Sequence, residues 1–157
     1  MSIRGGRHPI LVERHRKGES VPPVPLDLEL DRDHPMLLVT GPNMGGKTVA
    51  MKTAGLLALL AATGLPIPAD AGTVIPWFDR VICDIGDEQS ISSDVSTFLS
   101  HLRRVSEALE QATPRSLVLL DELGSGTRSR GPRWARRCWR RFWRGARSAW
   151  PRRTTEC

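Results

Sequence analysis

One octet, residues 41–48, combines glycines with a lysine and a threonine in the order Gly-Pro-Asn-Met-Gly-Gly-Lys-Thr. The spacing fits the phosphate-binding pattern G-x-x-x-x-G-K-[ST]. Glycines let the backbone turn tightly, so that successive N–H groups face phosphate oxygens. Lys47 can reach the β- and γ-phosphates of a nucleotide, and the hydroxyl of Thr48 can bind Mg²⁺. The candidate phosphate-binding residues are Gly41, Pro42, Asn43, Met44, Gly45, Gly46, Lys47 and Thr48.

The segments on either side of the octet place it where this chemistry needs it. The apolar run 36–40 predicts a buried strand before the loop, and residues 47–61 predict a helix after it. The start of that helix would add the positive end of its dipole to the site. A glycine-rich turn that happens to precede Lys-Thr is the alternative, and the strand and helix beside it argue against that alternative.

Two adjacent carboxylates end a second apolar run, residues 116–120. In nucleotidases of the phosphate-loop class, an Asp at such a strand end holds Mg²⁺, usually through water, and Asp121 is the candidate. Glu122 could act as the general base on the attacking water. A buried strand followed by an acidic turn is the structural alternative, and the position about seventy residues after the loop favours the catalytic interpretation.

Length and composition suggest one globular domain: the chain has 157 residues, of which 39% are hydrophobic and 25% charged. We expect a cytoplasmic protein without a membrane partner, because no secretory signal is visible and the most apolar stretch, 54–62, is too short to span a bilayer. The three cysteines show no disulfide framework, and the four histidines form no zinc-type cluster.

The order of the remaining segments predicts an α/β fold. Residues 24–30 alternate like a half-exposed strand, 64–68 should stop the helix, 74–83 offer another strand or two, and 96–112 read as a helix. Strand, helix, strand, helix and strand in this order predict three layers with a mainly parallel sheet and flanking helices.

Four short stretches together resemble the ATPase domain of the MutS family. They are residues 7–9 (Arg-His-Pro), 41–48, 96–98 (Ser-Thr-Phe) and 121–127 (Asp-Glu-Leu-Gly-Ser-Gly-Thr). The wording of residues 84–91 resembles one branch, the endonuclease MutS type two, which carries a C-terminal Smr nuclease domain. The resemblance covers about residues 3–127 and implies a P-loop NTPase fold, an ABC-like ATPase head that is incomplete here.

The resemblance also implies cofactors, partners and roles. It implies ATP and Mg²⁺, with Lys47 and Glu122 as catalytic residues and with Thr48 and Asp121 holding the metal. Ser96 and Thr97 would reach the γ-phosphate of the partner subunit in a homodimer, although a Ser or Thr before a helix is also a plain helix cap. DNA would bind through regions outside this chain, in mismatch repair, recombination control or the processing of branched DNA, and collided ribosomes are a further partner of this branch.

The chain departs from the family pattern after Thr127. Residues 128–157 contain eleven arginines, one acidic residue and four of the five tryptophans, so the net charge of +6 originates in this tail. We therefore expect three parts: a lead-in segment 1–35, a partial ATPase core 36–127, and a disordered tail 128–157 that a shift of reading frame has produced. An ATPase core cut short in this way should bind nucleotide weakly, with little or no turnover of ATP hydrolysis.

Three other interpretations stay open. A short protein that grips nucleic acid through the Arg/Trp tail would bind it with a steep salt dependence. Another ABC-like repair ATPase, such as an SMC-like head, should show a Ser-Gly-Gly signature where this chain has 96–98. The inert product of a damaged gene would have no stable fold and no response to ATP and Mg²⁺.

The frame-shift hypothesis predicts what the gene encodes in the shifted frame, read from the third base of each codon. Trp139 after Cys138 must then become Leu, as must Trp143 after Phe142, and residues 128–134 can become Pro-Glu-Pro-Gly-Ala-Ala-Leu. Sequencing the gene across the codons for 124–137 should reveal an insertion or deletion near Thr127. A clean frame that continues through the tail would instead favour a genuine Arg/Trp module.

Overall fold

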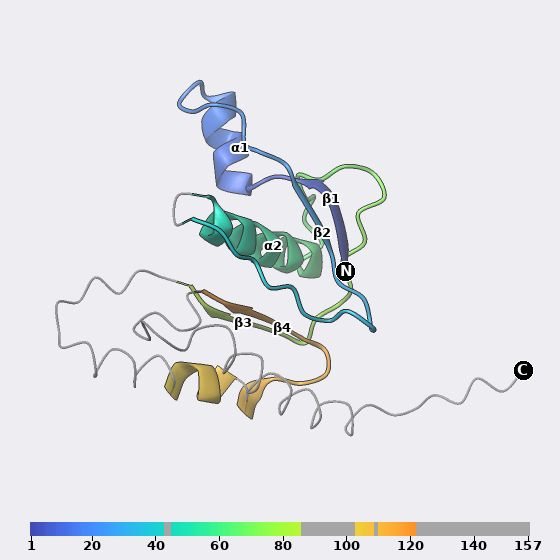
Figure 1. Ribbon diagram of the computed structural model, residues 1–157. Coiled ribbons are helices and arrows are strands. Elements are labelled where there is room, and N and C mark those ends of the chain that lie inside the picture. Colours follow the sequence, from blue (N-terminus) through green and yellow to red (C-terminus); the bar gives the residue numbers. More distant parts are fainter. Residues whose placement is uncertain (43–44, 86–102, 109, 122–157) are drawn as a thin grey trace, which may run out of the picture. The chain divides into compact units, whose positions relative to one another are not determined.

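The computed structural model describes residues 1–42, 45–85, 103–108 and 110–121, and shows a small α/β arrangement (Figure 1). The chain divides into two units, Met1–Val81 and a second that begins at Ile82. Within the described residues each unit contains a short sheet of two strands. The α/β class expected from the sequence is confirmed at this level.

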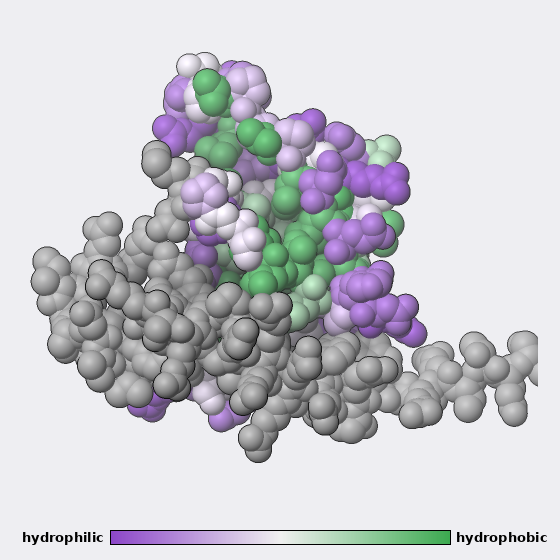
Figure 2. Space-filling view, viewed as in Figure 1, coloured by the Kyte–Doolittle hydropathy of each residue, from purple (hydrophilic) through white to green (hydrophobic). Residues whose placement is uncertain are grey.

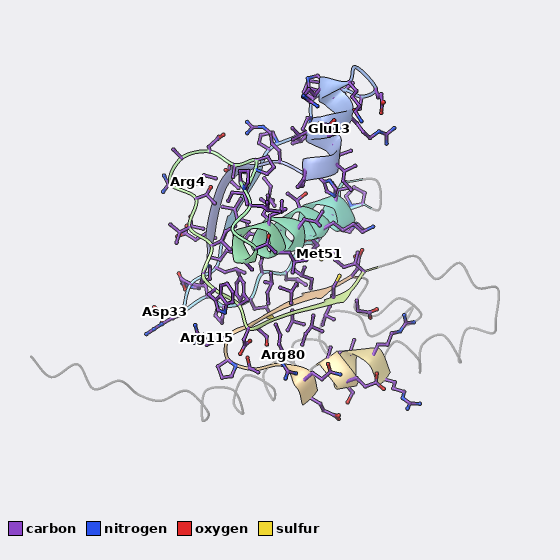
Figure 3. All side chains as sticks on the ribbon, turned by 180° about the vertical axis from the view of Figure 1, so that it is seen from behind. Arg4, Glu13, Asp33, Met51, Arg80 and Arg115 are labelled. Atoms are coloured by element: carbon purple, nitrogen blue, oxygen red, sulfur yellow. The ribbon has the colours of Figure 1, made fainter. Side chains whose placement is uncertain are left out.

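The first unit begins with a ribbon that the sequence analysis anticipated only in part. β1 (Ser2–Gly6) pairs antiparallel with β2 (Leu26–Glu29), and the pairing becomes irregular between Ile3 and Gly6. The predicted half-exposed strand 24–30 is thus confirmed as β2, whereas β1 was not predicted. Between them lies α1 (Pro9–Arg16), an exposed helix that starts with proline, as the first turn of a helix allows (Figure 3).

The helix predicted after the octet is confirmed as α2 (Lys47–Ala62). Its sequence is rich in alanine and leucine, which favour the helical backbone. The helix ends with Thr63 as the C-cap, and Gly64 follows with φ 74°. The N–H of Gly64 donates to Ala61 O at 3.1 Å and that of Leu65 to Leu60 O at 3.0 Å, the Schellman pattern that uses the last carbonyl groups.

The core of the first unit forms where β1 lies on α2. Ile3 is 1% exposed, Leu57 is fully buried and Ala54 is 2% exposed. Partly buried apolar residues from the ribbon and from the segment after α2 surround this cluster: Met1, Leu26, Leu28, Ile67 and Ile75. The ribbon and α2 therefore stabilise each other by removing apolar surface from water.

The strand predicted over residues 36–40 is wrong for this structure. These residues have no regular secondary structure, and Met36, Leu37 and Leu38 are more than half exposed. Figure 2 shows that hydrophobic surface is visible among the described residues. An apolar run of this kind forms a strand only where neighbouring strands form hydrogen bonds with its N–H and C=O groups. Other elements must also cover both faces of that strand. Within the part of the chain that the structure describes, no strand pairs with it.

The second unit confirms the strand predicted at 116–120. β4 (Ser116–Leu120) pairs with β3 (Arg80–Asp84), which spans the boundary between the units and covers part of the predicted 74–83 region. Residues 103–108 and 110–111 are helical, in agreement with the described part of the predicted helix 96–112. Arg104 Nη1 lies 3.6 Å from Asp84 Oδ1, which ties this helix to the end of β3.

A charged turn precedes the loop segment. The backbone N–H of His34 donates to Asp31 Oδ1, and the ring nitrogen Nδ1 of His34 lies 3.2 Å from Asp31 Oδ2. The hydrogen bond to Asp31 raises the pKa of His34 above its ordinary 6.5, and the backbone hydrogen bond from His34 lowers the pKa of Asp31 below 3.8. Among the described residues, no helix is long and apolar enough to cross a membrane.

Truncation of the buried leucine tests the role of the core. Leu57→Ala should lower the free energy of unfolding by about 2–5 kcal/mol, because it removes a fully buried side chain and leaves a cavity. Leu59 lies on the same helix but is 48% exposed, so Leu59→Ala should change it by no more than about 0.5 kcal/mol. Denaturant unfolding of the two variants measures the difference, and equal effects would contradict the packing described here.

The Asp31–His34 turn should show a defined pH dependence. A raised His34 pKa stabilises the turn fully below pH 6.5 and loses its effect as the pH rises through that raised pKa. The lowered Asp31 pKa acts above pH 3.8 and loses its effect as the pH falls through it. An NMR titration should find the His34 pKa above 6.5, and Asp31→Asn should return it toward that value.

The matched control for this titration is the neighbouring carboxylate. Asp33 contributes least to the raised pKa of His34, so Asp33→Asn should shift it less than Asp31→Asn does. A His34 pKa that is the same in the parent chain and in Asp31→Asn would show that the turn is not closed in solution.

Candidate functional site

The backbone of the octet turns back on itself just before α2. The N–H of Gly45 donates to Pro42 O at 2.9 Å, which closes the loop. Gly46 is the N-cap residue of α2 and has φ 76° and ψ 10°, in the left-handed region. A side chain at that position would cost about 1–2 kcal/mol, so glycine is the residue that this turn requires.

The first turn of α2 has features that suit an anion. Its N-cap residue, Gly46, has no side chain to cap the helix, and no acidic residue lies in the first turn. The first N–H groups of a helix have no partner within the helix, and the helix dipole places partial positive charge there. The N–H of Ala50 does donate to Gly46 O at 2.9 Å, so the turn itself is formed. The arrangement suits a phosphate group.

Lys47 lies over the loop. Its ammonium donates to Gly41 O at 2.8 Å and to Pro42 O at 2.7 Å. An ammonium has three N–H donors, and these contacts use two of them. The lysine thus joins the two ends of the octet and holds a positive charge at the mouth of the loop.

The structure describes only part of the predicted site. Gly41, Pro42 and residues 45–48 lie together at the start of α2, and Thr48 is the second residue of that helix. In the second unit, Asp121 directly follows β4, as predicted, and its N–H donates to Asp84 O at 2.9 Å. The other predicted site residues lie outside the described residues: Asn43, Met44, Ser96, Thr97 and Glu122.

The Arg-His-Pro stretch lies at the start of α1. His8 is the N-cap residue of that helix, and its Nδ1 atom is buried without a hydrogen-bond partner among the described residues. Burial lowers the pKa of His8 below 6.5, and the positive charge of Lys52 on α2 lowers it further. The imidazole is therefore mainly neutral at pH 7, and the positive charge that acts on it is that of Lys52 on α2.

Two carboxylates that sequence reasoning missed hold this stretch in place. Asp27 Oδ1 accepts a hydrogen bond from the N–H of Gly5 at 2.8 Å, and Asp70 Oδ1 accepts one from Arg7 Nη1 at 3.1 Å. Neither residue belongs to a recognisable motif, and the distances along the chain are long. The adjacent pair Gly5-Gly6 is the one signal in the sequence that points to a close approach there.

One further hollow among the described residues is separate from the octet. A cavity of about 460 Å³ lies on the ribbon, lined by Ser2, Ile3, Arg4, Gly5, Asp27, Leu28, Glu29 and Asp70, and no residue of the octet lines it. Among the described residues, no group of three His, Cys, Asp or Glu side chains could hold a metal ion by itself. The octet with α2 is therefore the best candidate for a binding site.

Comparisons with known proteins show which family this chain resembles. The sequence profile of MutS domain V matches residues 37–136, more than half of the chain. Relatives named endonuclease MutS2 are similar to this chain: 52% identical in Halothermothrix orenii and 54% in Pelotomaculum thermopropionicum, each over 127 residues. A third, from Fusobacterium nucleatum, is 51% identical over the same length.

The matches cover most of this chain but only a small part of each relative. Each spans 81% of this chain and 15% of the relative, so the chain corresponds to about one seventh of the length of the relatives it matches. The profile match includes the octet and Asp121 and ends nine residues after Thr127. From this match and these identities, we conclude that the chain belongs to the MutS family.

Proposed function

We propose that this chain binds ATP with Mg²⁺ through residues 41–48, as the nucleotide-binding part of a MutS-family ATPase domain. The observation that carries the proposal is the start of α2, where Gly46 turns the chain and Lys47 lies over the loop at an uncapped helix end. A triphosphate has the negative charge and the oxygen acceptors that this arrangement favours.

Each described residue of the loop has a separate task in this proposal. The N–H groups of the first turn of α2 and the ammonium of Lys47 bind the β- and γ-phosphate oxygens. Lys47 exchanges a contact with the loop carbonyls for one with phosphate, a charge-assisted and therefore stronger hydrogen bond. Thr48 and Asp121 hold the metal ion, which when bound neutralises charge that develops on the phosphates.

Hydrolysis requires residues beyond the loop. Glu122 follows Asp121 directly and would orient the attacking water and accept its proton. Ser96 and Thr97 would reach the nucleotide of a partner subunit, so the complete protein would act as a homodimer with ATP at the shared surface. We expect this chain alone to bind ATP without appreciable hydrolysis. Hydrolysis requires the base and the residues of a partner subunit to lie around the same nucleotide.

The setting of this activity is a proposal about the whole protein. The domain would be a P-loop NTPase, an ABC-like head with a mainly parallel sheet, in which residues 1–35 lead into the partial ATPase core 36–127. Membership of the family supports a cytoplasmic protein that couples ATP to DNA binding in repair or recombination control. The name of the relatives includes a nuclease activity, and for the whole protein we also propose an interaction with ribosomes.

The test is the affinity of the full 157-residue chain for ATP with Mg²⁺. Lys47→Ala should weaken binding by about 10- to 100-fold, because a hydrogen bond to a charged group contributes roughly 1.5–3 kcal/mol. Titration calorimetry measures this directly. At an ATP concentration of 100 times Kd, the parent chain should also gain about 2.7 kcal/mol in unfolding free energy, and the variant much less.

The matched control is a second lysine of the same unit. Lys17 lies at the end of α1, 3.5 Å from Glu13, and Lys17→Ala should leave the affinity unchanged. A parent chain that does not bind ATP with Mg²⁺, or a Lys47→Ala variant that binds as tightly as Lys17→Ala, would refute the proposed site.

A further inference from the structure

We propose that Arg7 and Asp70 are positioning residues for the phosphate loop. They fix the junction between β1 and α1 against α2, and thereby the direction in which the first turn of α2 presents its N–H groups. The consequence for nucleotide affinity rests on the function proposed above, whereas the geometry of the junction can be tested without a nucleotide.

The junction begins with a glycine in the left-handed region, and the Asp70 carboxylate lies close against it. Gly5 has φ 55°, and a Cβ atom there would lie 1.9 Å from Asp70 Oδ2. The N–H of Gly5 donates to Asp27 Oδ1 at 2.8 Å from the other strand of the ribbon. The end of β1 is thus in direct contact with the carboxylate of Asp70 on one side and bonded to β2 on the other.

The segment that follows α2 forms backbone hydrogen bonds with the chain on both sides of Gly5. The N–H of Asp70 donates to Arg4 O, and the N–H of Arg7 donates to Pro68 O, each at 2.8 Å. Figure 3 shows Arg4 beside this segment. The guanidinium of Arg7 completes the closure, since Nη1 donates to Gly5 O at 2.9 Å and to Asp70 Oδ1 at 3.1 Å. One arginine therefore joins the bend to the segment that holds it.

The same junction interacts with α2 at two places. A Cβ atom on Gly6 would lie 2.9 Å from Leu57 Cδ1, so the end of β1 rests on the middle of the helix. His8, the next residue after Arg7, has a buried Nδ1 atom and interacts with the charge of Lys52, nearer the loop. α1 and α2 are also in contact. A change at Arg7 or Asp70 therefore reaches the helix whose first turn forms the site.

The exposure of the pair distinguishes positioning from stability. The side chains of Arg7 and Asp70 are 38% and 60% exposed, and ion pairs this exposed contribute little to folding. Removing one partner should leave the fold intact because the two backbone hydrogen bonds and the apolar core remain. Loss of the ion pair should instead change the stability and direction of the first turn of α2.

The experiment compares Asp70→Ala, Arg7→Ala and the double variant in the full chain. We expect ATP with Mg²⁺ to bind about two- to fivefold more weakly to each single variant, in the range by which residues of a coupled network alter binding. The double variant should be no weaker than the singles, because the pair acts as a unit. Arg7→Lys, which keeps the charge but not the fork of donors, should recover part of the loss.

A second readout needs no nucleotide. The Ala50 N–H closes the first turn of α2 on Gly46 O, so its hydrogen exchange should be at least about twofold faster in Asp70→Ala, while the amide of Leu57 exchanges as before. Glu19, an exposed carboxylate 3.8 Å from Arg14, supplies the control, and Glu19→Ala should change neither readout.

The outcomes separate the two proposals. Faster exchange at Ala50 alone supports positioning, even if the parent chain does not bind ATP and the proposed function fails. Unchanged exchange at Ala50 in Asp70→Ala overturns the positioning role, even if the parent chain binds ATP. Faster exchange at both Ala50 and Leu57 also overturns it, because the pair would then act on the stability of the whole unit.

Discussion

The first unit depends on the burial of one helix face against one strand. Leu57 and Ala54 of α2 meet Ile3 of β1, and these three residues form the cluster of nearly complete burial there. Each such leucine or isoleucine contributes roughly 1.5–3 kcal/mol when it is removed from water, more than any exposed ion pair on the surface. The two glycines that end β1 are a condition of this contact, since a side chain on Gly6 would collide with Leu57. The direction of α2, and with it that of the loop at its start, follows from this packing.

The chemistry of the site depends on what the start of α2 lacks. A helix usually gains stability from a side-chain cap or an acidic residue in its first turn, and α2 has neither. Gly46 turns the chain into the helix in a conformation that other residues adopt at a cost, and Lys47 adds a positive charge above it. Local stability that a cap would supply is thus given up, which suits the phosphate-binding role proposed for the loop. The buried core further along α2 supports a helix whose first turn is arranged in this way.

The chain contains only part of what the proposed ATPase activity needs. The chain corresponds to 15% of relatives to which it is about half identical. Several apolar side chains of the first unit remain on its surface, among them Val24, Leu38, Val74 and Trp77. Phosphate binding needs one loop and one helix end, which this unit contains. Hydrolysis needs a metal ligand, a base and a signature loop around the same nucleotide, and the residues proposed for them come from distant parts of the sequence.

Features that arise from interactions between near neighbours could be predicted from the sequence. The span of α2, its end at Gly64 and the strand 116–120 were all predicted, because helix propensity, glycine geometry and apolar runs act over a few residues. Tertiary structure alone decided the pairing of β1 with β2, the contacts of Asp27 and Asp70, and the absence of a strand at 36–40. A strand has no hydrogen bonds of its own, so an apolar run becomes one only where distant segments pair with it. For the same reason, the carboxylates that hold Gly5 and Arg7 carry no signal in the sequence around them.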